Sequence, residues 1–246
     1  MNIMAQGTMS SLKLACRDCS LHQVCLPVGV EPEELAELDR IIRQRRPLRR
    51  GEHLFRVGDP FDSLYVVRSG SVKTYAPVSD GREQITGFHL PGELMGLDAI
   101  SRGQHPCGAR ALETSSVCEV PFEALENLGG RIPTLHHQIY HLMSREILQE
   151  EGHLLLLGRR GADERLASYL LNLSERLRRR GFSPSEFHLS MSRGDIGNYL
   201  GLAVETVSRT FTRFQERGLL SVERKHVRIR EFEVLQELAG VDGEGE

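Results

Sequence analysis

The pattern of hydrophobic and polar residues changes twice along the chain. Residues 33–42 carry apolar side chains at helical spacing, and Pro47 ends this first predicted helix. From Leu48 to Pro121, short apolar or alternating runs are separated by glycine-containing turns. Several short strands at this spacing are typical of an antiparallel β-roll or barrel. Beyond Pro133 the helical period returns, so the pattern predicts a β-domain followed by a largely helical C-terminal part.

One long helix is predicted from Pro133 to about Leu157, with a single apolar stripe along it. Glu150 stands where another apolar residue is expected. A stripe of this kind after a compact β-domain is typical of a coiled-coil seam or of a strut between domains. Packing on the core of its own domain remains the alternative. The expected dimer seam comprises Ile139, Met143, Ile147, Glu150, Leu154 and Leu157.

Two short helices in the last third are joined by the turn 201–203, which contains a glycine. Ser192 and Asp195 form a capping-box-like pair at the start of the first helix. This arrangement predicts a helix-turn-helix. The buried side of its second helix is expected to comprise Val204, Val207, Phe211 and Phe214. Further on, two short apolar runs flank a basic tip at residues 224–226, as in the wing of a winged helix.

If that side is buried, an i, i+3, i+4, i+7 set is left on the exposed face of the second helix. This set comprises Glu205, Ser208, Arg209 and Thr212. A glutamate can accept a hydrogen bond from cytosine, and an arginine can bind both acceptors of guanine. The expected phosphate contacts, which position a protein on DNA without reading sequence, are Arg213, Arg224, Lys225 and Arg228. The alternative is an ordinary solvated amphipathic helix, which the preceding turn and the following basic hairpin disfavour.

Composition is that of a soluble protein with a real core. The 246 residues are 39% hydrophobic and 26% charged, and the formal net charge of −3 does not suggest a general polyanion binder. Basic residues nevertheless exceed acidic ones between His188 and Arg230. No signal-peptide pattern and no membrane-length apolar run occur, so we expect a cytoplasmic protein without a membrane partner. No G-x-S-x-G, Walker or H-E-x-x-H motif occurs, and we expect no enzymatic activity.

Three of the five cysteines, Cys16, Cys19 and Cys25, follow a C-x2-C-x5-C spacing near the N-terminus. Thiolates this close in sequence can converge on one soft metal centre. Iron–sulfur clusters usually take four cysteines, whereas structural zinc sites more often show two separated pairs. The fourth ligand would be Cys107 or Cys118. Five cysteines in 246 residues are too sparse, and odd in number, for a disulfide scaffold, and incidental or redox-active thiols are the remaining alternative.

Four stretches of this sequence together resemble the fumarate and nitrate reduction (FNR) regulators of the cyclic-AMP receptor protein superfamily. They are residues 83–90, 111–114, 117–121 and 193–209. The resemblance implies an α+β fold with an N-terminal β-roll (cyclic-nucleotide-binding-like jelly roll) sensor domain, a long dimerisation helix and a C-terminal winged helix-turn-helix. The implied domains are a cluster-binding segment at 1–30, the roll at 31–132, the helix and hinge at 133–160, and the DNA-binding domain at 161–246.

The resemblance also implies a cofactor and partners. The cofactor is an oxygen-labile 4Fe–4S cluster, with Cys118 as fourth ligand because it lies in the family's Val-Cys-Glu segment. The partners are double-stranded DNA with a two-fold symmetric TTGAT-type site, read by Glu205, Ser208 and Arg209, a second copy in a homodimer, and RNA polymerase, contacted through the turn at Asp80 and Gly81.

Control by a cyclic nucleotide or by thiol oxidation on the same fold is the alternative. Residues 91–94 resemble the ribose-binding part of a cyclic-nucleotide cassette. The arginine that would neutralise the cyclic phosphate is missing from the sequence at 105–108, and a buried charge without a partner is strongly unfavourable. We therefore expect no cyclic nucleotide to bind.

Overall fold

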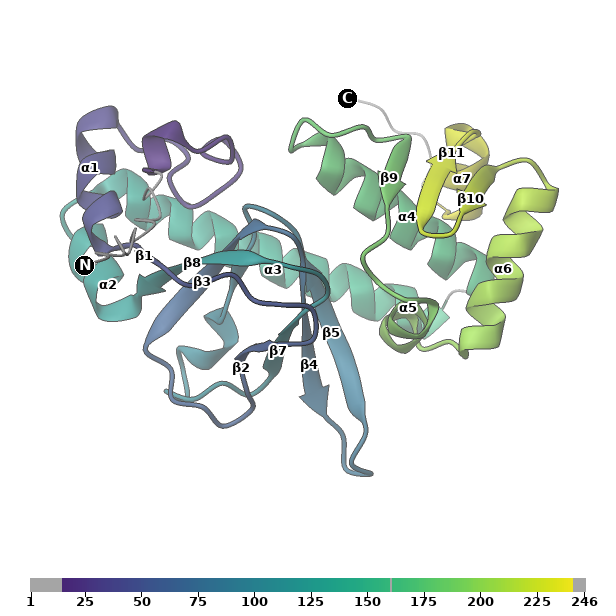
Figure 1. Ribbon diagram of the computed structural model, residues 1–246, viewed down its shortest axis with the longest axis horizontal. Coiled ribbons are helices and arrows are strands. Elements are labelled where there is room, and N and C mark those ends of the chain that lie inside the picture. The colour runs from purple at the N-terminus through teal and green to yellow at the C-terminus, as the bar shows by residue number, and fades with distance from the viewer. Residues whose placement is uncertain (1–14, 160, 241–246) are drawn as a thin grey trace, which may run out of the picture.

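The computed structural model describes residues 15–159 and 161–240 of the chain. A β-roll and a helical DNA-binding domain lie at opposite ends of one long helix (Figure 1). This arrangement confirms the predicted α+β fold. The first fourteen residues of the expected cluster-binding segment, and Arg160 of the expected hinge, lie outside the described residues. Within the described ranges, no helix combines the length and the apolar character needed to cross a membrane.

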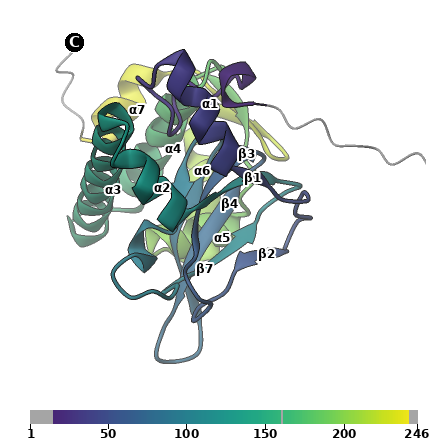
Figure 2. The same ribbon diagram turned by 90° about the vertical axis from the view of Figure 1, so that its left-hand side faces the viewer.

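The N-terminal part is a compact loop followed by a short helix. The loop begins with the 3-10 turn η1 (Cys16–Asp18) and leads into α1 (Pro32–Ile41). Pro32 occupies the first turn of α1, where its missing N–H costs nothing, and acidic residues follow it there. Figure 2 shows α1 beside α2 (Phe122–Gly129) at the near end of the long helix.

The roll consists of two four-stranded antiparallel sheets, with strand orders β1-β8-β3-β6 and β2-β7-β4-β5. The first sheet comprises β1 (Arg43–Gln44), β8 (Ser116–Pro121), β3 (Ser63–Ser69) and β6 (Leu94–Met95). The second comprises β2 (His53–Phe55), β7 (Gly108–Ala111), β4 (Val72–Pro77) and β5 (Glu83–His89). The 3-10 turn η2 (Leu97–Ala99) follows β6. Strand β5 has a strand neighbour on one side only, so its other edge is open to contacts from elsewhere in the molecule.

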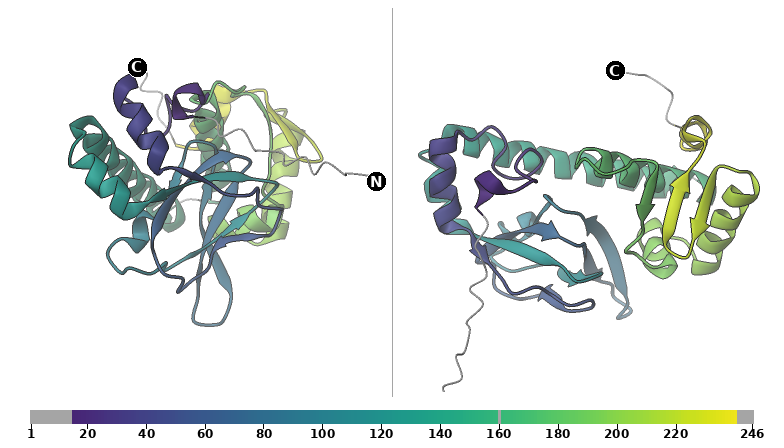
Figure 3. Two further views of the ribbon diagram at one scale, coloured as in Figure 1. Left: turned by 60° about the vertical axis from the view of Figure 1, so that its left-hand side comes forward. Right: turned by 45° about the horizontal axis from the view of Figure 1, so that its top comes forward.

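The long helix α3 spans Pro133–Arg159 and joins the two ends of the molecule (Figure 3, right). Its first turns pack on the roll, where Leu135 is fully buried and Ile139 lies half-buried against the same core. Ile139 therefore does not share the exposed stripe in which the sequence analysis placed it. Tyr140, the next residue, is 56% exposed. Farther along, the exposed apolar side chains are Met143, Ile147, Leu148, Leu154 and Leu155.

The C-terminal domain is a winged helix-turn-helix. It comprises α4 (Ala162–Arg178), β9 (Glu186–His188), α5 (Arg193–Leu200), α6 (Val204–Glu216), β10 (Leu220–Glu223), β11 (His226–Ile229) and α7 (Phe232–Leu238). The wing is the hairpin β10–β11, completed by β9 into a three-stranded sheet. Helix α7 was not among the elements expected from the sequence, and its Leu235 is fully buried in the domain core.

The two domains share one hydrophobic cluster. Tyr75, Ile85 and Phe88 of the second sheet join the core of the DNA-binding domain. The ring of Phe88 packs against Tyr199 of α5 with the centroids 5.1 Å apart. Because the apolar contact and several polar ones cross this junction, the DNA-binding domain is docked on the roll rather than hanging from α3.

Candidate metal centre and nucleic-acid interface

The cysteine loop is closed by a series of tight turns. The backbone N–H of Cys19 donates to the carbonyl of Cys16 at 3.1 Å, and that of His22 donates to Cys19 at 3.2 Å. The loop is anchored to α1, because the N–H of Cys16 donates to a carboxylate oxygen of Asp39 at 2.6 Å. These turns bring together the three thiols whose close spacing in the sequence suggested that they could converge.

A small cavity brings the fourth cysteine to this loop. Cys118, on β8, lines it together with Cys16, Cys19 and Cys25. The remaining walls are mostly apolar: Leu21, Leu26, Pro27, Ile42, Val66, Val67 and Val120. Cys107 lies elsewhere, in a separate core cluster of the roll, where its thiol donates to Asp98 at 3.1 Å. The structure thus separates the two candidates for fourth ligand that the cysteine spacing left open.

Burial favours the protonated form of three of the thiols that line this cavity, those of Cys16, Cys25 and Cys118. Burial raises the pKa of Cys25 to about 12. Burial, together with the charge of Asp39, raises the pKa of Cys16, and burial also raises that of Cys118. All five cysteines are free. A metal has to displace these protons on binding, because only thiolates serve as ligands.

The donor set of this cavity is four thiols, the ligand type that iron–sulfur groups take. A single zinc holds each sulfur about 2.3 Å from one point. No group of three or more His, Cys, Asp or Glu side chains within residues 15–159 and 161–240 is arranged to hold one metal ion. A four-iron cluster needs its four thiolates spread around a larger body, with a dry environment. The four cysteines line a cavity whose other walls are mostly apolar, so the thiols and the dry environment of such a group are both present.

The helix-turn-helix is built from local signals. Ser192 accepts a hydrogen bond from the N–H of Asp195, and the Asp195 carboxylate accepts one from Ser192 in return. Gly201 ends α5 with a φ of +63°, a conformation that favours glycine. Gly197 permits the turn to close on α5, because a Cβ there would lie 2.6 Å from the carbonyl oxygen of Leu202.

The exposed face of α6 carries all four residues expected to read DNA: Glu205, Ser208, Arg209 and Thr212. The hydroxyls of Ser208 and Thr212 donate to carbonyls one turn earlier in the helix. Glu205 and Arg209 have no hydrogen bond or ion pair with the part of the chain that the structure describes. These two long side chains are therefore the ones free to reach base edges.

The buried side of α6 differs from the expected one at two positions, Val204 and Thr210. Val204 is 42% exposed, because it is the first residue of the helix and projects beyond the domain core. Thr210 is fully buried instead, and its hydroxyl lies 3.4 Å from the Asp163 carboxylate. The hydroxyl is tolerated in the core because this partner is present.

The four basic residues expected to contact phosphates are not equally available. Arg213 forms an ion pair with Asp163 of α4, and Arg228 forms one with Glu186 of β9. Lys225 donates to the carbonyl of Ser190 at 3.1 Å. Arg224, at the tip of the wing with a φ of +57°, is exposed, and no ion pair joins it to the described part of the chain. A phosphate would have to displace a carboxylate from Arg213 or Arg228 but not from Arg224.

The turn between β4 and β5 holds Asp80 and Gly81. Both are exposed, and the Asp80 carboxylate accepts from the side chain of Arg82 at 2.7 Å. Gly81 has a φ of +83°. In Figure 1 this hairpin projects from the bottom of the roll, away from the other elements.

Carboxylates on α3 lie beside its exposed apolar residues. The side chain of Glu150 is largely exposed, and the partial burial of its carboxyl raises its pKa. Glu146, one turn earlier, is half-buried, and burial together with the like charge of Glu150 raises its pKa to about 7. Sequence reasoning found Glu150 from the interrupted stripe but missed Glu146, since its burial depends on the neighbouring domain.

Comparisons with known proteins cover both domains. The family of the cyclic nucleotide-binding domain matches residues 45–131, and the Crp-like helix-turn-helix domain matches residues 164–238. The transcriptional activator protein Anr of Pseudomonas aeruginosa is 54% identical over 230 residues, which is 94% of each chain. The fumarate and nitrate reduction regulatory protein of Escherichia coli is 52% identical, over 92% of this chain and 90% of that one.

The chain belongs to the FNR family of transcription regulators. The resemblance read from the four sequence stretches is thereby confirmed. The structure of this chain is similar to that of FixK2 from Bradyrhizobium japonicum, with a TM-score of 0.74. The two sequences are 34% identical, and the match covers 80% of this chain and 97% of that one.

Proposed function

We propose that this FNR-family chain is an oxygen-responsive transcription regulator of the cytoplasm and not an enzyme. It binds a 4Fe–4S cluster through Cys16, Cys19, Cys25 and Cys118. As a homodimer under anaerobic conditions it binds two-fold symmetric TTGAT-type DNA sites and activates or represses genes. The observation that carries the proposal is that all four of these cysteines line one cavity with mostly apolar walls.

The cluster supplies an oxygen-labile cross-link between the N-terminal loop and β8. Cys118 lies on β8, which runs directly into α2 and then α3. Cys25 is connected to α3 itself, because the side-chain amide of Gln138 donates to its carbonyl at 3.4 Å. Holding the loop against these elements therefore orders the residues that pack beside the base of the long helix.

Dimerisation uses the exposed apolar side of α3. Met143, Ile147 and Leu154 are exposed, as a seam awaiting a second copy requires. Tyr140 extends this seam in place of Ile139, and Leu157 lies half-buried at its far end. Glu150 brings a negative charge close to its own copy across a two-fold axis, which weakens the seam and leaves the dimer dependent on the state of the cysteine loop.

Sequence reading is assigned to Glu205, Ser208 and Arg209 on α6, with Thr212 beside them. Arg209 binds guanine with both arms of its guanidinium, which discriminates by roughly 1–3 kcal/mol per base. Arg224 and Lys225 on the wing contact phosphates, and Arg213 joins them once Asp163 is displaced. The turn at Asp80 and Gly81 contacts RNA polymerase.

Cyclic-nucleotide control is the second candidate, because the matched domain family carries that name. The position that would bind the ribose is Glu93, and its carboxylate is already bonded to Arg176 of α4 and to Arg180, which follows that helix. A ligand would have to break both ion pairs, and the residues at 105–108 offer it no arginine. We therefore propose that no cyclic nucleotide binds.

The test is the absorption spectrum, with iron and sulfide analysis, of protein purified without oxygen. Cys118→Ser should abolish the cluster, since it removes one of four ligands from the cavity. Cys107→Ser is the matched control and should keep most of the iron and sulfide. A protein that keeps its iron after Cys118→Ser and loses it after Cys107→Ser contradicts the ligand assignment.

A further inference from the structure

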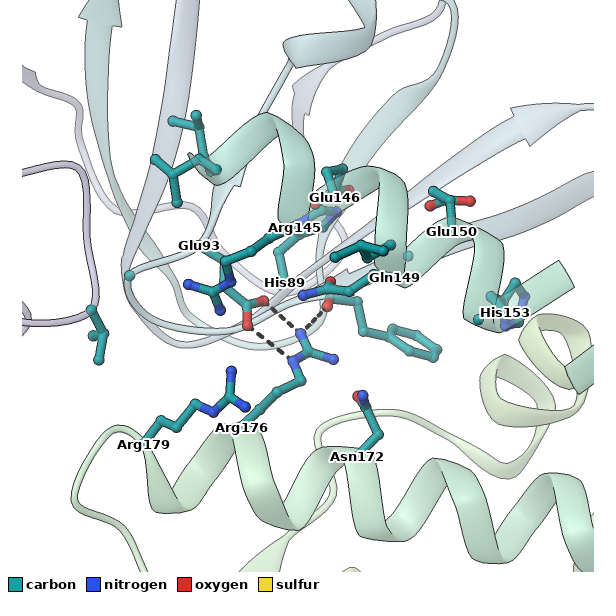
Figure 4. A pocket seen from close by; sticks show the side chains of 18 of the residues that line it. His89, Glu93, Arg145, Glu146, Gln149, Glu150, His153, Asn172, Arg176 and Arg179 are labelled. Carbon is teal, nitrogen blue, oxygen red and sulfur yellow. Dashed lines mark hydrogen bonds and ion pairs between the residues drawn. The ribbon is translucent and has the colours of Figure 1, made fainter. Parts of the chain in front are cut away.

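A groove of about 990 Å³ separates α3 from α4 and has the turn between β5 and β6 as its floor. Figure 4 shows Arg176 reaching from α4 across this groove to Glu93 of the turn. The carboxylate of Glu93 accepts from Arg176 at 2.9 Å and 2.5 Å and from Arg180 at 2.6 Å. One acidic residue of the roll thus holds two arginines of the DNA-binding domain.

This contact is built as a buried site. The side chain of Arg180 is 4% exposed and that of Glu93 is 19% exposed. Burial alone would raise the pKa of Glu93, but the positive charge of Arg176 and its hydrogen bonds lower it to about 2. Arg176 also donates to the carbonyl of Phe88, and Arg180 donates to that of Pro91 at 2.5 Å. The two guanidinium groups therefore fix both the side chain and the backbone of the turn.

The opposite side of the same turn contacts the cysteine loop. Gly92 has a φ of +87°, and a Cβ built on it would lie 3.0 Å from a methyl carbon of Val24. Val24 is the residue immediately before Cys25 in the cysteine cavity. The turn at 90–93 is therefore held between the metal-binding loop and the DNA-binding domain.

A backbone amide reports whether the domains are docked. The N–H of Ile85 donates to the side-chain oxygen of Asn198 at 2.6 Å. Ile85 lies on β5, the edge strand of its sheet, and Asn198 lies on α5. Separation of the domains removes this acceptor and exposes the amide to solvent.

We propose that Glu93, Arg176 and Arg180 form a clamp that holds the DNA-binding domain on the roll, and that the cysteine loop governs this clamp through the contact between Val24 and Gly92. The part of this inference that links the clamp to the metal centre rests on the proposed function. It differs from the dimer seam because it runs within one copy of the chain. A disturbance of the cysteine loop then reaches α4 through three consecutive contacts: Val24 with Gly92, Glu93 with the arginines, and the arginines with the helix.

The experiment measures amide hydrogen exchange by NMR in the full-length chain without metal. Glu93→Gln keeps the size of the side chain but removes its charge, and Arg180→Gln weakens the clamp from the other domain. Both should speed exchange at Ile85 by roughly tenfold or more, since each leaves a buried charge short of its partner. Glu175→Gln is the matched control, because Glu175 also pairs with two arginines, Arg178 and Arg179, and both of these ion pairs lie within the DNA-binding domain.

Exchange within the β3–β8 pair separates undocking from general destabilisation. These amides should exchange as in the unaltered chain in all the variants. Unchanged exchange at Ile85 in Glu93→Gln and Arg180→Gln, or equal acceleration in the β3–β8 pair, overturns the clamp.

The link to the cysteine loop is tested after anaerobic reconstitution with iron and sulfide. Reconstitution should slow exchange at Ile85 in the unaltered chain, and Val24→Ala should remove most of that effect while keeping the same iron content. Equal slowing in both proteins overturns the link. If neither takes up iron and sulfide, the proposed function fails, and the metal-free measurements still decide whether the clamp exists.

Discussion

Glu146 carries a charge in an unfavourable position, which makes its removal a sharp test of the electrostatics around α3. Its carboxyl is half-buried, and burial together with the charge of Glu150 raises its pKa from 4.5 to about 7. Glu146→Gln removes the charge and keeps the size of the side chain. The substitution should therefore stabilise the folded chain wherever the carboxyl is ionised.

The size of the effect follows from the shift in pKa. Because the folded state has the higher pKa, it binds more protons than the unfolded state between pH 4.5 and 7, and the free energy of unfolding falls as pH rises through this window. Each unit of pKa corresponds to about 1.4 kcal/mol, so the full penalty is on the order of 3 kcal/mol above pH 7. At pH 5 it is under about 1 kcal/mol, since the folded carboxyl is then largely protonated.

Urea unfolding of the metal-free chain at pH 5 and pH 8 measures this difference, at a concentration where sedimentation shows monomers. Glu146→Gln should raise the free energy of unfolding by about 2–3 kcal/mol more at pH 8 than at pH 5. Glu151→Gln is the control, because Glu151 is exposed on the same helix. Equal changes in the two variants at both pH values would refute the reasoning.

Predictions for four further substitutions concern the seam and the DNA-binding surface. Glu150→Ala should strengthen the dimer in air by roughly 1–2 kcal/mol, because it removes a like-charge contact that solvent only partly screens; sedimentation measures this, with Gln149→Ala as control. Arg209→Ala should flatten the preference for guanine at one position of each half-site, at a cost of roughly 1–3 kcal/mol in binding free energy per half-site. Arg224→Ala should instead weaken binding to all sequences equally and reduce the salt dependence by about one counterion per site. Titrations on matched and substituted sites at two salt concentrations separate these outcomes, and equal losses on cognate and random DNA in Arg209→Ala contradict the assignment. Glu186→Gln frees Arg228 and should strengthen binding to all sequences by a few-fold, since exposed ion pairs are worth about 0.2–1 kcal/mol; unchanged affinity at low salt would show that Arg228 does not approach DNA.

The helix-turn-helix could be predicted from the sequence because its determinants are local. Ser192 and Asp195 are three residues apart, and Gly201 follows directly on the helix that it ends. The face of α6 followed from helical periodicity alone. Val204 was misplaced because periodicity assigns a direction to each side chain but does not show how far the core extends beneath the first turn.

The sides of α3 could not be assigned in the same way. Apolar residues occur on more than one side of this helix, and Ile139 and Tyr140 both fit a helical repeat. Which of them is exposed depends on where the roll touches α3, and that contact involves residues far away in sequence. Likewise, Glu93 and Arg176 are 83 residues apart, so no spacing rule connects them. The sequence identified Glu93 as part of a nucleotide cassette but not as a partner of α4.

The charges of α3 and of the domain junction are not independent. Glu93 adds to the rise in the pKa of Glu146, and Arg176 opposes it. Since Arg176 is held by Glu93, it neutralises Glu146 only in part, and Glu146 keeps its raised pKa. A second copy packing on α3 would bury Glu146 and Glu150 further, where an unpaired carboxylate is costly. The positive charge that lowers the pKa of Glu146 is that of Arg176, which is already paired with Glu93 in the clamp. In the proposed dimer, the seam and the clamp therefore depend on the same arginine, and strengthening one alters the charge available to the other.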